Sequence, residues 1–156
     1  SGGSSALNPS PSIEKASEPV PEAALPVGPE IVSAPDTLEG SLSAYVKRMR
    51  AEVSAEGRTL IVYVGAMWCE PCKRFHDALK AGELQASLPR VTFLEFDYDL
   101  HRRGLQEAGY LTRMVPSFAI PTPEGKSSGR LHQGAVKGPG AVDFIVPKVK
   151  ALLAVE

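Results

Sequence analysis

Two thiols, Cys69 and Cys72, are the side chains of this sequence best suited to chemistry. They are the only cysteines among 156 residues, and Glu70 and Pro71 separate them. A stabilising disulfide framework would need more cysteines, spread along the chain. The spacing lets the two sulfurs bond to each other with little strain. The pair therefore indicates a reactive dithiol rather than scaffolding.

The sequence around the pair places it between a strand and a helix. Thr59 to Gly65 is apolar and β-branched without alternation, which is typical of a strand covered on both faces. A helix is predicted from about Pro71 to Lys80, and Pro71 suits its first turn because the missing N–H would have no partner there. The sulfur of Cys69 would then face the helix N-terminus, where free N–H groups and the helix dipole favour the thiolate.

This position predicts a division of labour between the two cysteines. We expect Cys69 to be the nucleophile at the exposed start of the helix. Cys72, one turn further along and more buried, would resolve a mixed disulfide. Trp68, directly before the pair, would form a partly exposed flap over it.

A zinc site is the alternative interpretation of the pair. Cys69, Cys72 and His76 have a ligand-like spacing, but a structural zinc needs four ligands, and only His101 and His132 remain to supply a histidine. Attachment of haem would need a histidine directly after the second cysteine, where Lys73 stands. We expect no metal and no cofactor, and we interpret His76 as an ordinary surface histidine.

The remaining elements predict an α/β domain. Strands alternate with helices, which implies parallel pairing, and the short turn at Thr122 to Gly125 implies an antiparallel hairpin near the end. The result would be a mixed sheet of four or five strands flanked by helices. Pro147 lies inside the last helical pattern and should kink that helix or delay its start. The expected elements are a helix from Leu42 that ends at Gly57, strands at 91–97, 117–120 and 131–134, a helix at 101–108 and a last helix carrying Val142 to Leu153.

The first 40 residues differ in composition from the rest. They hold seven of the fourteen prolines, and their six acids and one lysine give a local net charge of −5. Such a segment buries too little apolar surface to offset its chain entropy. We therefore predict a disordered, proline-rich tether at 1–35, whose deletion leaves the melting temperature nearly unchanged, and a folded domain at 36–156. A short stretch from Pro29 to Ala34 could still add a strand to the domain.

Charge and hydropathy exclude several classes of protein. The net charge of −1 gives no indication of nucleic-acid binding. The longest apolar run, Leu60 to Trp68, is too short to span a bilayer. We find no basic region followed by an apolar run, so no intact signal peptide is expected.

The run from Leu60 to Lys73 resembles the first central strand and active-site loop of the thioredoxin superfamily. Val115-Pro116-Ser117 resembles the cis-proline loop of that family, which faces the dithiol and offers backbone groups to an extended substrate. Gly125 and Gly134 resemble glycines of its hairpin and of the segment before its last helix. The resemblance runs from Thr59 to Leu153 and implies a thioredoxin fold with a cis Pro116. The substrate-binding residues that it implies are Trp68, Glu70, Pro71, Val115 and Pro116.

Two positions depart from the family pattern. Tyr63 stands where common thioredoxins have a buried Asp, and Glu95 stands where they have its Lys partner. The strand period puts Glu95 on the opposite face from its neighbours Leu94 and Phe96. If Glu95 is buried behind the dithiol, its pKa should rise, and it could exchange a proton with Cys72, ordered by the Tyr63 hydroxyl. The alternative is a solvated Glu95 at the surface.

The function implied by the resemblance is reduction of protein disulfides. Trp before the cysteines and Glu-Pro between them resemble membrane-tethered, extracytoplasmic thioredoxins, so we expect a monomer outside the cytoplasm that receives electrons from a membrane partner. Two alternatives are a disulfide donor or isomerase in oxidative folding and a non-catalytic binding module. Glu70 argues against a donor, because its negative charge disfavours a thiolate and lowers the reduction potential.

Overall fold

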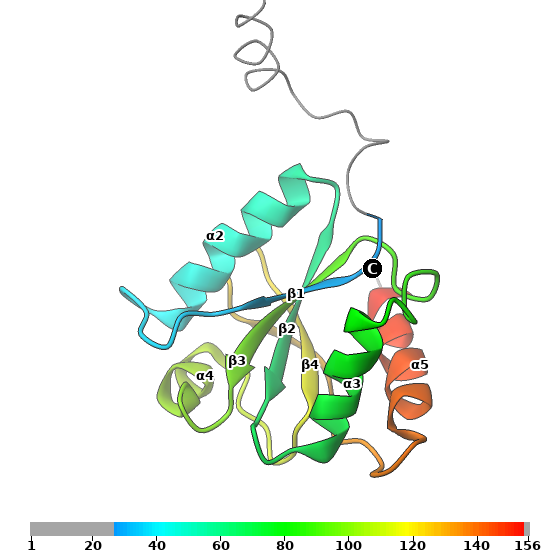
Figure 1. Ribbon diagram of the computed structural model, residues 1–156. Helices are drawn as coiled ribbons and strands as arrows, with labels where there is room; N and C mark the ends of the chain where they lie inside the picture. Colours follow the sequence, from blue (N-terminus) through cyan, green and yellow to red (C-terminus); the bar gives the residue numbers. More distant parts are fainter. Residues whose placement is uncertain (1–26, 155–156) are drawn as a thin grey trace, which may run out of the picture.

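The computed structural model describes residues 27–154. The apolar runs of the sequence form five strands, which make one sheet (Figure 1). Their bounds are β1 Glu30–Ser33, β2 Thr59–Gly65, β3 Val91–Asp97, β4 Ser117–Pro121 and β5 Ser127–Gln133. The strand order is β1-β3-β2-β4-β5. Strands β1, β3 and β2 are parallel, and β4 runs antiparallel to both β2 and β5, so the sheet is mixed as expected.

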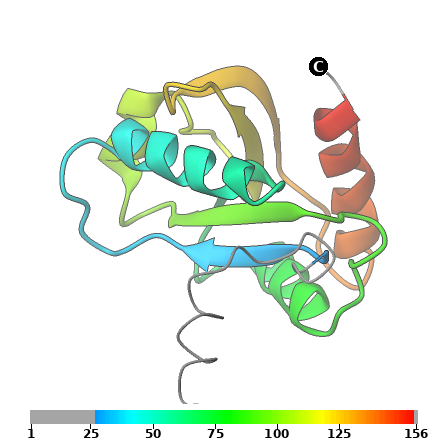
Figure 2. The same cartoon turned by 90° about the horizontal axis from the view of Figure 1, so that it is seen from above.

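Four helices in the described residues cover the two faces of the sheet. Their bounds are α2 Leu42–Ala55, α3 Glu70–Lys80, α4 Arg102–Ala108 and α5 Ala141–Ala154. Seen from above, α2 and α4 lie on one side of the sheet, and α3 and α5 lie on the other (Figure 2). None of these four helices is long and apolar enough to cross a membrane.

Each face of the sheet has its own hydrophobic core. Because side chains alternate along a strand, β2 sends Leu60, Val62 and Val64 toward α2 and α4, and Ile61 and Tyr63 toward α3 and α5. The dithiol belongs to the second core, together with Phe75 of α3 and the inner face of α5. The unbroken apolar run in β2 is thus explained by burial on both faces.

The N-terminal edge of the sheet corrects the predicted domain boundary. Residues 30–33 form β1, which pairs with β3, and the backbone N–H of Ala34 donates to the Glu95 carbonyl at 2.9 Å. Residues 30–33 therefore belong to the folded domain, as the Pro29–Ala34 alternative anticipated, and a tether extending to residue 35 is wrong. The rest of the predicted tether, residues 1–26, lies outside the described residues.

A buried arginine, Arg58, holds the same edge together. Its guanidinium donates to the Thr92 hydroxyl and to the carbonyls of Gly28 and Val91, each at 2.8 Å. It also forms an ion pair with Glu30 of β1 at 3.4 Å. These contacts connect the chain before β2 to both β1 and β3. The sequence pattern gave no indication of this role for Arg58.

Two other elements differ from their predicted bounds. β5 begins at Ser127, earlier than predicted, although its first residues are polar. Ser127 belongs to the strand because it pairs with Pro121 of β4, beyond a register irregularity. α5 begins at Ala141, so Pro147 does not delay its start.

Candidate active site

The Cys69–Cys72 disulfide lies where β2 passes into α3. Cys69 is the N-cap of α3, and its sulfur accepts a hydrogen bond from the backbone N–H of Cys72 at 3.2 Å. The two residues form a disulfide, with their Cα atoms 5.3 Å apart. Pro71 is buried in the first turn, as predicted. The Cys69 sulfur therefore sits among the unpaired N–H groups of the helix N-terminus, which stabilise a negative charge there.

Exposure does not distinguish the two cysteines in the disulfide form. Cys69 is 5% exposed and Cys72 is 3% exposed, so the expected contrast between an exposed and a buried thiol is absent. The position at the helix cap is what distinguishes them. Only Cys69 accepts a hydrogen bond from the first turn.

Trp68 is exposed beside the disulfide. Its side chain is 67% exposed, its indole N–H donates to Asp99 at 2.8 Å, and its ring meets the edge of Tyr98. The indole is thus held by the segment after β3, on the rim of the site. Met67, the preceding residue, is 97% exposed.

Glu70 carries a stabilised negative charge at the first position of α3. Its carboxylate accepts a hydrogen bond from the Gly138 N–H at 2.8 Å and pairs with Arg74 at 3.2 Å. The hydrogen bond from Gly138, together with the hydrogen bond and charge of Arg74, lowers the pKa of Glu70 below its ordinary value. Glu70 is therefore ionised at neutral pH, but Arg74 offsets part of its charge.

The Val115–Pro116 loop lies at the same end of the sheet as the disulfide. β4 begins directly after it, and Ser117 pairs with Val64 near the end of β2, one residue before the loop that leads to Cys69. The Val115–Pro116 peptide bond is cis, as the resemblance implied. Pro116 is buried, and its carbonyl accepts a hydrogen bond from the Gly134 N–H at 2.8 Å.

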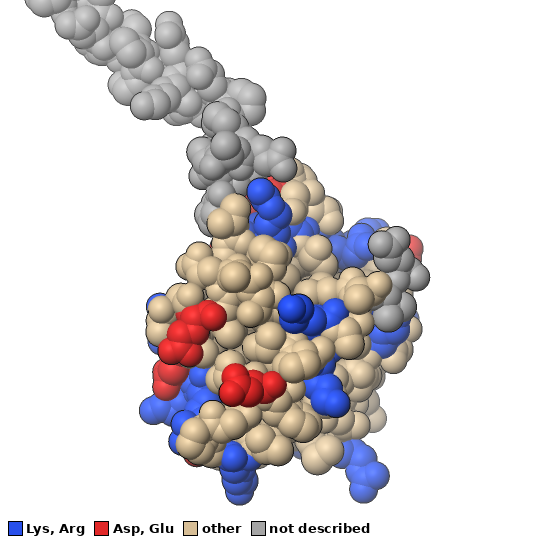
Figure 3. Space-filling view, turned by 90° about the vertical axis from the view of Figure 1, so that its right-hand side faces the viewer, with Lys and Arg blue, Asp and Glu red and all other residues tan. Residues whose placement is uncertain are grey.

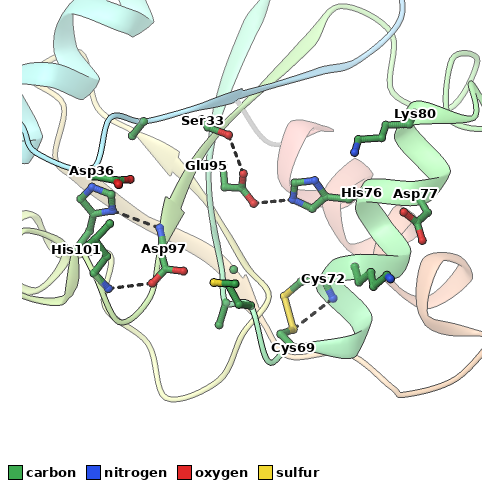
Figure 4. A pocket seen from close by; sticks show the side chains of 16 residues that line it. Ser33, Asp36, Cys69, Cys72, His76, Asp77, Lys80, Glu95, Asp97 and His101 are labelled. Carbon is green, nitrogen blue, oxygen red and sulfur yellow. Dashed lines mark hydrogen bonds and ion pairs between the residues drawn. A yellow bond between two sulfur atoms is a disulfide. The ribbon is translucent and has the colours of Figure 1, made fainter.

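A cavity of about 610 Å³ opens behind the disulfide, between α3 and the strands β1 and β3 (Figure 4). Both cysteines line it. Titratable side chains of α3 and β3 surround the space, as the close view shows. They include His76, Asp77, Lys80, Glu95 and Asp97.

Glu95 lies at the back of this cavity. It faces away from the core that holds Leu94 and Phe96, and it pairs in register with Tyr63, as expected. Its carboxylate accepts a hydrogen bond from the Ser33 hydroxyl at 3.0 Å and contacts His76 Nε2 at 2.5 Å. Glu95 is therefore neither fully solvated nor buried with the Tyr63 hydroxyl as its partner, the two arrangements that the sequence suggested.

The expected rise in the pKa of Glu95 is also wrong. Burial is the largest single influence and raises the pKa, whereas the hydrogen bond and charge of His76 lower it. The Ser33 hydroxyl and the charge of Lys80 lower it further, so that the pKa of Glu95 lies below its ordinary value. Glu95 is therefore a carboxylate at neutral pH and holds no proton to exchange.

His76 is the residue that sequence reasoning missed. It is half-buried against Glu95, not an ordinary surface histidine, and its ring packs 5.7 Å from that of Tyr63. The available signal was its spacing of four residues from Cys72, which puts both side chains on one face of α3. Among residues 27–154, no group of three or more His, Cys, Asp or Glu side chains is arranged to hold a metal ion.

Tyr63 is fully buried behind the disulfide. Its ring stacks on Phe118, and its hydroxyl has no hydrogen-bond partner among the described residues. Burial and the negative charge of Glu95 raise its pKa. The hydroxyl lies 2.9 Å from the point that a Cβ on Gly65 would occupy, and the Cys72 sulfur lies 3.5 Å from that point. Tyr63 therefore fills the space behind Cys72, and the expectation that its hydroxyl orders Glu95 is wrong.

The face of the molecule on the side of α5 carries charges of both signs. Seen from the side of α5, basic and acidic side chains are interspersed with uncharged surface, and neither sign covers this face (Figure 3). This face therefore carries no dominant charge.

The strand order, the mixed pairing and the cis-proline loop beside a dithiol at a helix N-terminus decide the fold. The chain has a thioredoxin fold. Among solved structures it is similar to a Trichomonas vaginalis thioredoxin, with 20% identity, a TM-score of 0.49 and coverage of 78% of this chain and 92% of that chain. It is also similar to poplar thioredoxin h, PtTrxh4, with 18% identity, a TM-score of 0.45 and coverage of 83% and 99%.

A third similar structure is the thioredoxin NaTrxh of Nicotiana alata, with 20% identity, a TM-score of 0.42 and coverage of 85% of this chain and 97% of that chain. No protein-family model and no curated protein sequence matches the chain. The chemistry of the site is therefore derived below from the residues of this chain.

Proposed function

We propose that this chain is a thiol–disulfide oxidoreductase that reduces disulfide bonds in other proteins. The observation that carries the proposal is the sulfur of Cys69 at the N-terminus of α3, bonded to Cys72 and accepting the Cys72 N–H. A thiolate at this point is stabilised by the helix and lies beside a second thiol that can displace it.

The reaction follows from the positions of the two thiols. In the reduced chain, the Cys69 thiolate attacks one sulfur of a substrate disulfide and releases the other as a thiolate. The Cys72 thiolate then attacks the Cys69 sulfur, which forms the Cys69–Cys72 bond and releases the second substrate thiol. Two electrons move to the substrate, and the chain is left as the disulfide that the structure holds.

Exposed apolar side chains around the disulfide support a protein substrate. Met67, Trp68 and Met114 are 97%, 67% and 55% exposed, and they flank Cys69 and the Pro116 loop in the sequence. Isolated apolar residues are common on surfaces, but here they flank the two loops of one site. We assign the loop Val115–Pro116 and the side chains of Trp68 and Glu70 to substrate contact.

Two charged residues near Cys69, Glu70 and Arg74, bear on the direction of electron flow. Glu70 is ionised beside Cys69, which disfavours the thiolate and supports a reductase. Arg74 offsets part of that charge, and this observation favours the second candidate, a donor of disulfides or an isomerase. We place the reductase outside the cytoplasm, with a membrane protein as electron donor, on the resemblance of Trp-Cys-Glu-Pro-Cys to membrane-tethered thioredoxins.

Insulin reduction tests the activity, and the reduction potential tests its direction. The wild-type chain should accelerate the reduction of insulin by a dithiol reagent, whereas Cys69→Ser should not. Inactivity of the wild-type chain would leave the non-catalytic binding module. Titration against glutathione should give a potential nearer the roughly −270 mV of thioredoxin than the −120 mV of a strong oxidant. A value above about −180 mV would support the donor instead.

A further inference from the structure

We propose that His76 is the proton acceptor for Cys72, and that Glu95 positions its imidazole for this role. The inference deepens the proposed function, since it concerns the second step of thiol–disulfide exchange at the same dithiol. It assigns a residue of α3 that is neither a thiol nor part of the substrate-binding loops.

The geometry places His76 beside the resolving cysteine. Cys72 and His76 are four residues apart on α3, which brings their side chains onto one face of the helix about 5–6 Å apart at Cβ. Both side chains line the cavity behind the disulfide (Figure 4).

The pairing with Glu95 decides which ring nitrogen of His76 can accept the proton. Glu95 is ionised and can only accept hydrogen bonds, so the Nε2 atom that contacts it at 2.5 Å must carry a hydrogen. In the neutral imidazole the lone pair is then on Nδ1. Ser33 holds the other carboxylate oxygen at 3.0 Å, which fixes the carboxylate in place from β1.

The groups that face His76 come from every element around the cavity. Glu95 approaches from β3 and Ser33 from β1, while Tyr63 packs against the ring from β2. On α3 itself, the neighbouring charges are Lys73, Asp77 and Lys80, and Asp36, Asp97 and His101 line the far side of the cavity. Of these groups, only Glu95 makes a hydrogen bond to the imidazole.

The step balances without any further reactant. The Cys72 thiol gives its proton to His76 Nδ1, directly or through water, and the resulting thiolate attacks the Cys69 sulfur of the mixed disulfide. The Cys69–Cys72 bond forms, the bond from Cys69 to the substrate sulfur breaks, and the departing substrate thiolate takes up a proton from the imidazolium or from solvent. Glu95 stabilises the imidazolium by hydrogen bonding and by charge.

The reaction of the reduced chain with a small aromatic disulfide separates the two steps. Attack by Cys69 releases one coloured thiolate, and attack by Cys72 releases a second, so that the two phases can be timed by stopped flow. In His76→Gln the second phase should be about a hundredfold slower at neutral pH, the low end of what a general base contributes. The difference should shrink as the pH rises, because more of the Cys72 thiol then ionises without a base. The first phase should be unchanged, and Asp77→Asn, on the same helix and the same cavity, should leave both phases unchanged.

A second measurement does not depend on the variant. The chain has three histidines, so their imidazole signals can be titrated by NMR in the oxidised and reduced forms. The pH-dependent imidazole signals of His76 should differ between the two forms, whereas those of His132, which bonds to the Gly134 carbonyl, should not. Glu95→Gln should shift the pH dependence of the second phase without changing the first.

Equal slowing of the second phase at every pH, or of both phases together, would show that His76 is only structural and overturn the proposal. Identical pH-dependent signals of His76 in both redox forms would also overturn it, even if His76→Gln failed to fold. The small-disulfide assay needs no protein substrate, so a chain that shows these phases and yet does not reduce insulin would refute the proposed function while leaving the role of His76 intact.

Discussion

Gly65→Ala is expected to destabilise the domain through one contact. Gly65 is the last residue of β2, and its backbone conformation is open to alanine because its φ is not positive. A Cβ at this position would lie 2.9 Å from the hydroxyl and 3.2 Å from Cζ of Tyr63. Tyr63 cannot move away easily, because its ring is packed against Phe75, Phe93 and Phe118.

The expected change in the free energy of unfolding of Gly65→Ala is the difference of two effects. Replacing glycine within a strand by alanine stabilises a protein by about 0.5–1 kcal/mol. Overpacking in a closed core costs about 1–3 kcal/mol. The closest atom, the Tyr63 hydroxyl, is fully buried, so we expect overpacking to dominate and the free energy of unfolding to fall by about 1 kcal/mol.

Tyr63→Phe provides the matched background for this test. It removes the atom that would clash and also a buried hydroxyl that has no hydrogen-bond partner among the described residues. Burying such a group costs about 1–3 kcal/mol, so Tyr63→Phe alone should stabilise the chain by about 1 kcal/mol. In that background Gly65→Ala should be nearly neutral, because the remaining neighbours lie at 3.2 and 3.5 Å.

Urea unfolding of the four oxidised proteins measures the coupling, with unchanged m-values as the condition for comparison. The double-mutant cycle should give a coupling energy of about 1 kcal/mol, within the range seen for residues in contact. The reasoning fails if Gly65→Ala costs the same in both backgrounds. It also fails if Tyr63→Phe lowers the stability.

Three further predictions concern stability. In urea unfolding, Arg58→Ala should lower the free energy of unfolding by about 2 kcal/mol or more, because it removes several charge-assisted hydrogen bonds from a buried site. The control Arg103→Ala, whose ion pair is exposed, should lower it by less than about 1 kcal/mol. The pKa of Glu95 is lower in the folded chain, so its contribution to stability is present above its unfolded pKa of about 4.3 and is lost as the pH falls through its folded pKa. The free energy of unfolding of Glu95→Gln should therefore fall less steeply with decreasing pH below about pH 4 than that of the wild-type chain. Identical curves would contradict this. A chain that begins at residue 35 should melt roughly 5 °C or more below one that begins at residue 27, because it lacks β1, and equal calorimetric melting temperatures would show that β1 adds nothing.

The sequence predicted the elements whose pattern is set by burial. The bounds of β2 and β3 were predicted as the structure has them, because the apolar run of β2 is buried on two faces and most residues of β3 are buried. Cys69 was placed at the helix N-terminus correctly, since its place between a strand and Pro71 fixes where the helix begins. The β5 strand was predicted too short, because its first half is polar and carries no hydrophobic alternation.

The parts that failed depend on contacts between distant segments. Nothing in the local sequence shows that Ser33, His76 and Glu95 meet, since they lie on β1, α3 and β3. The pKa of Glu95 was mispredicted for this reason: burial was anticipated, but the groups of His76, Ser33 and Lys80 that together outweigh burial were not. Arg58 was missed in the same way, because an arginine before a strand is usually solvated.

Trapping of mixed disulfides tests the central claim, that Cys69 attacks and Cys72 resolves, most directly. Each single-cysteine variant is incubated with a disulfide-containing protein such as insulin, and the covalent adducts are identified by mass spectrometry. Cys72→Ser should accumulate an adduct through Cys69, because the thiolate at the helix N-terminus reacts and no thiol remains to release the substrate. Cys69→Ser should accumulate little or none. Equal trapping by both variants, or trapping by Cys69→Ser alone, would contradict the assigned order and with it the role of the helix N-terminus.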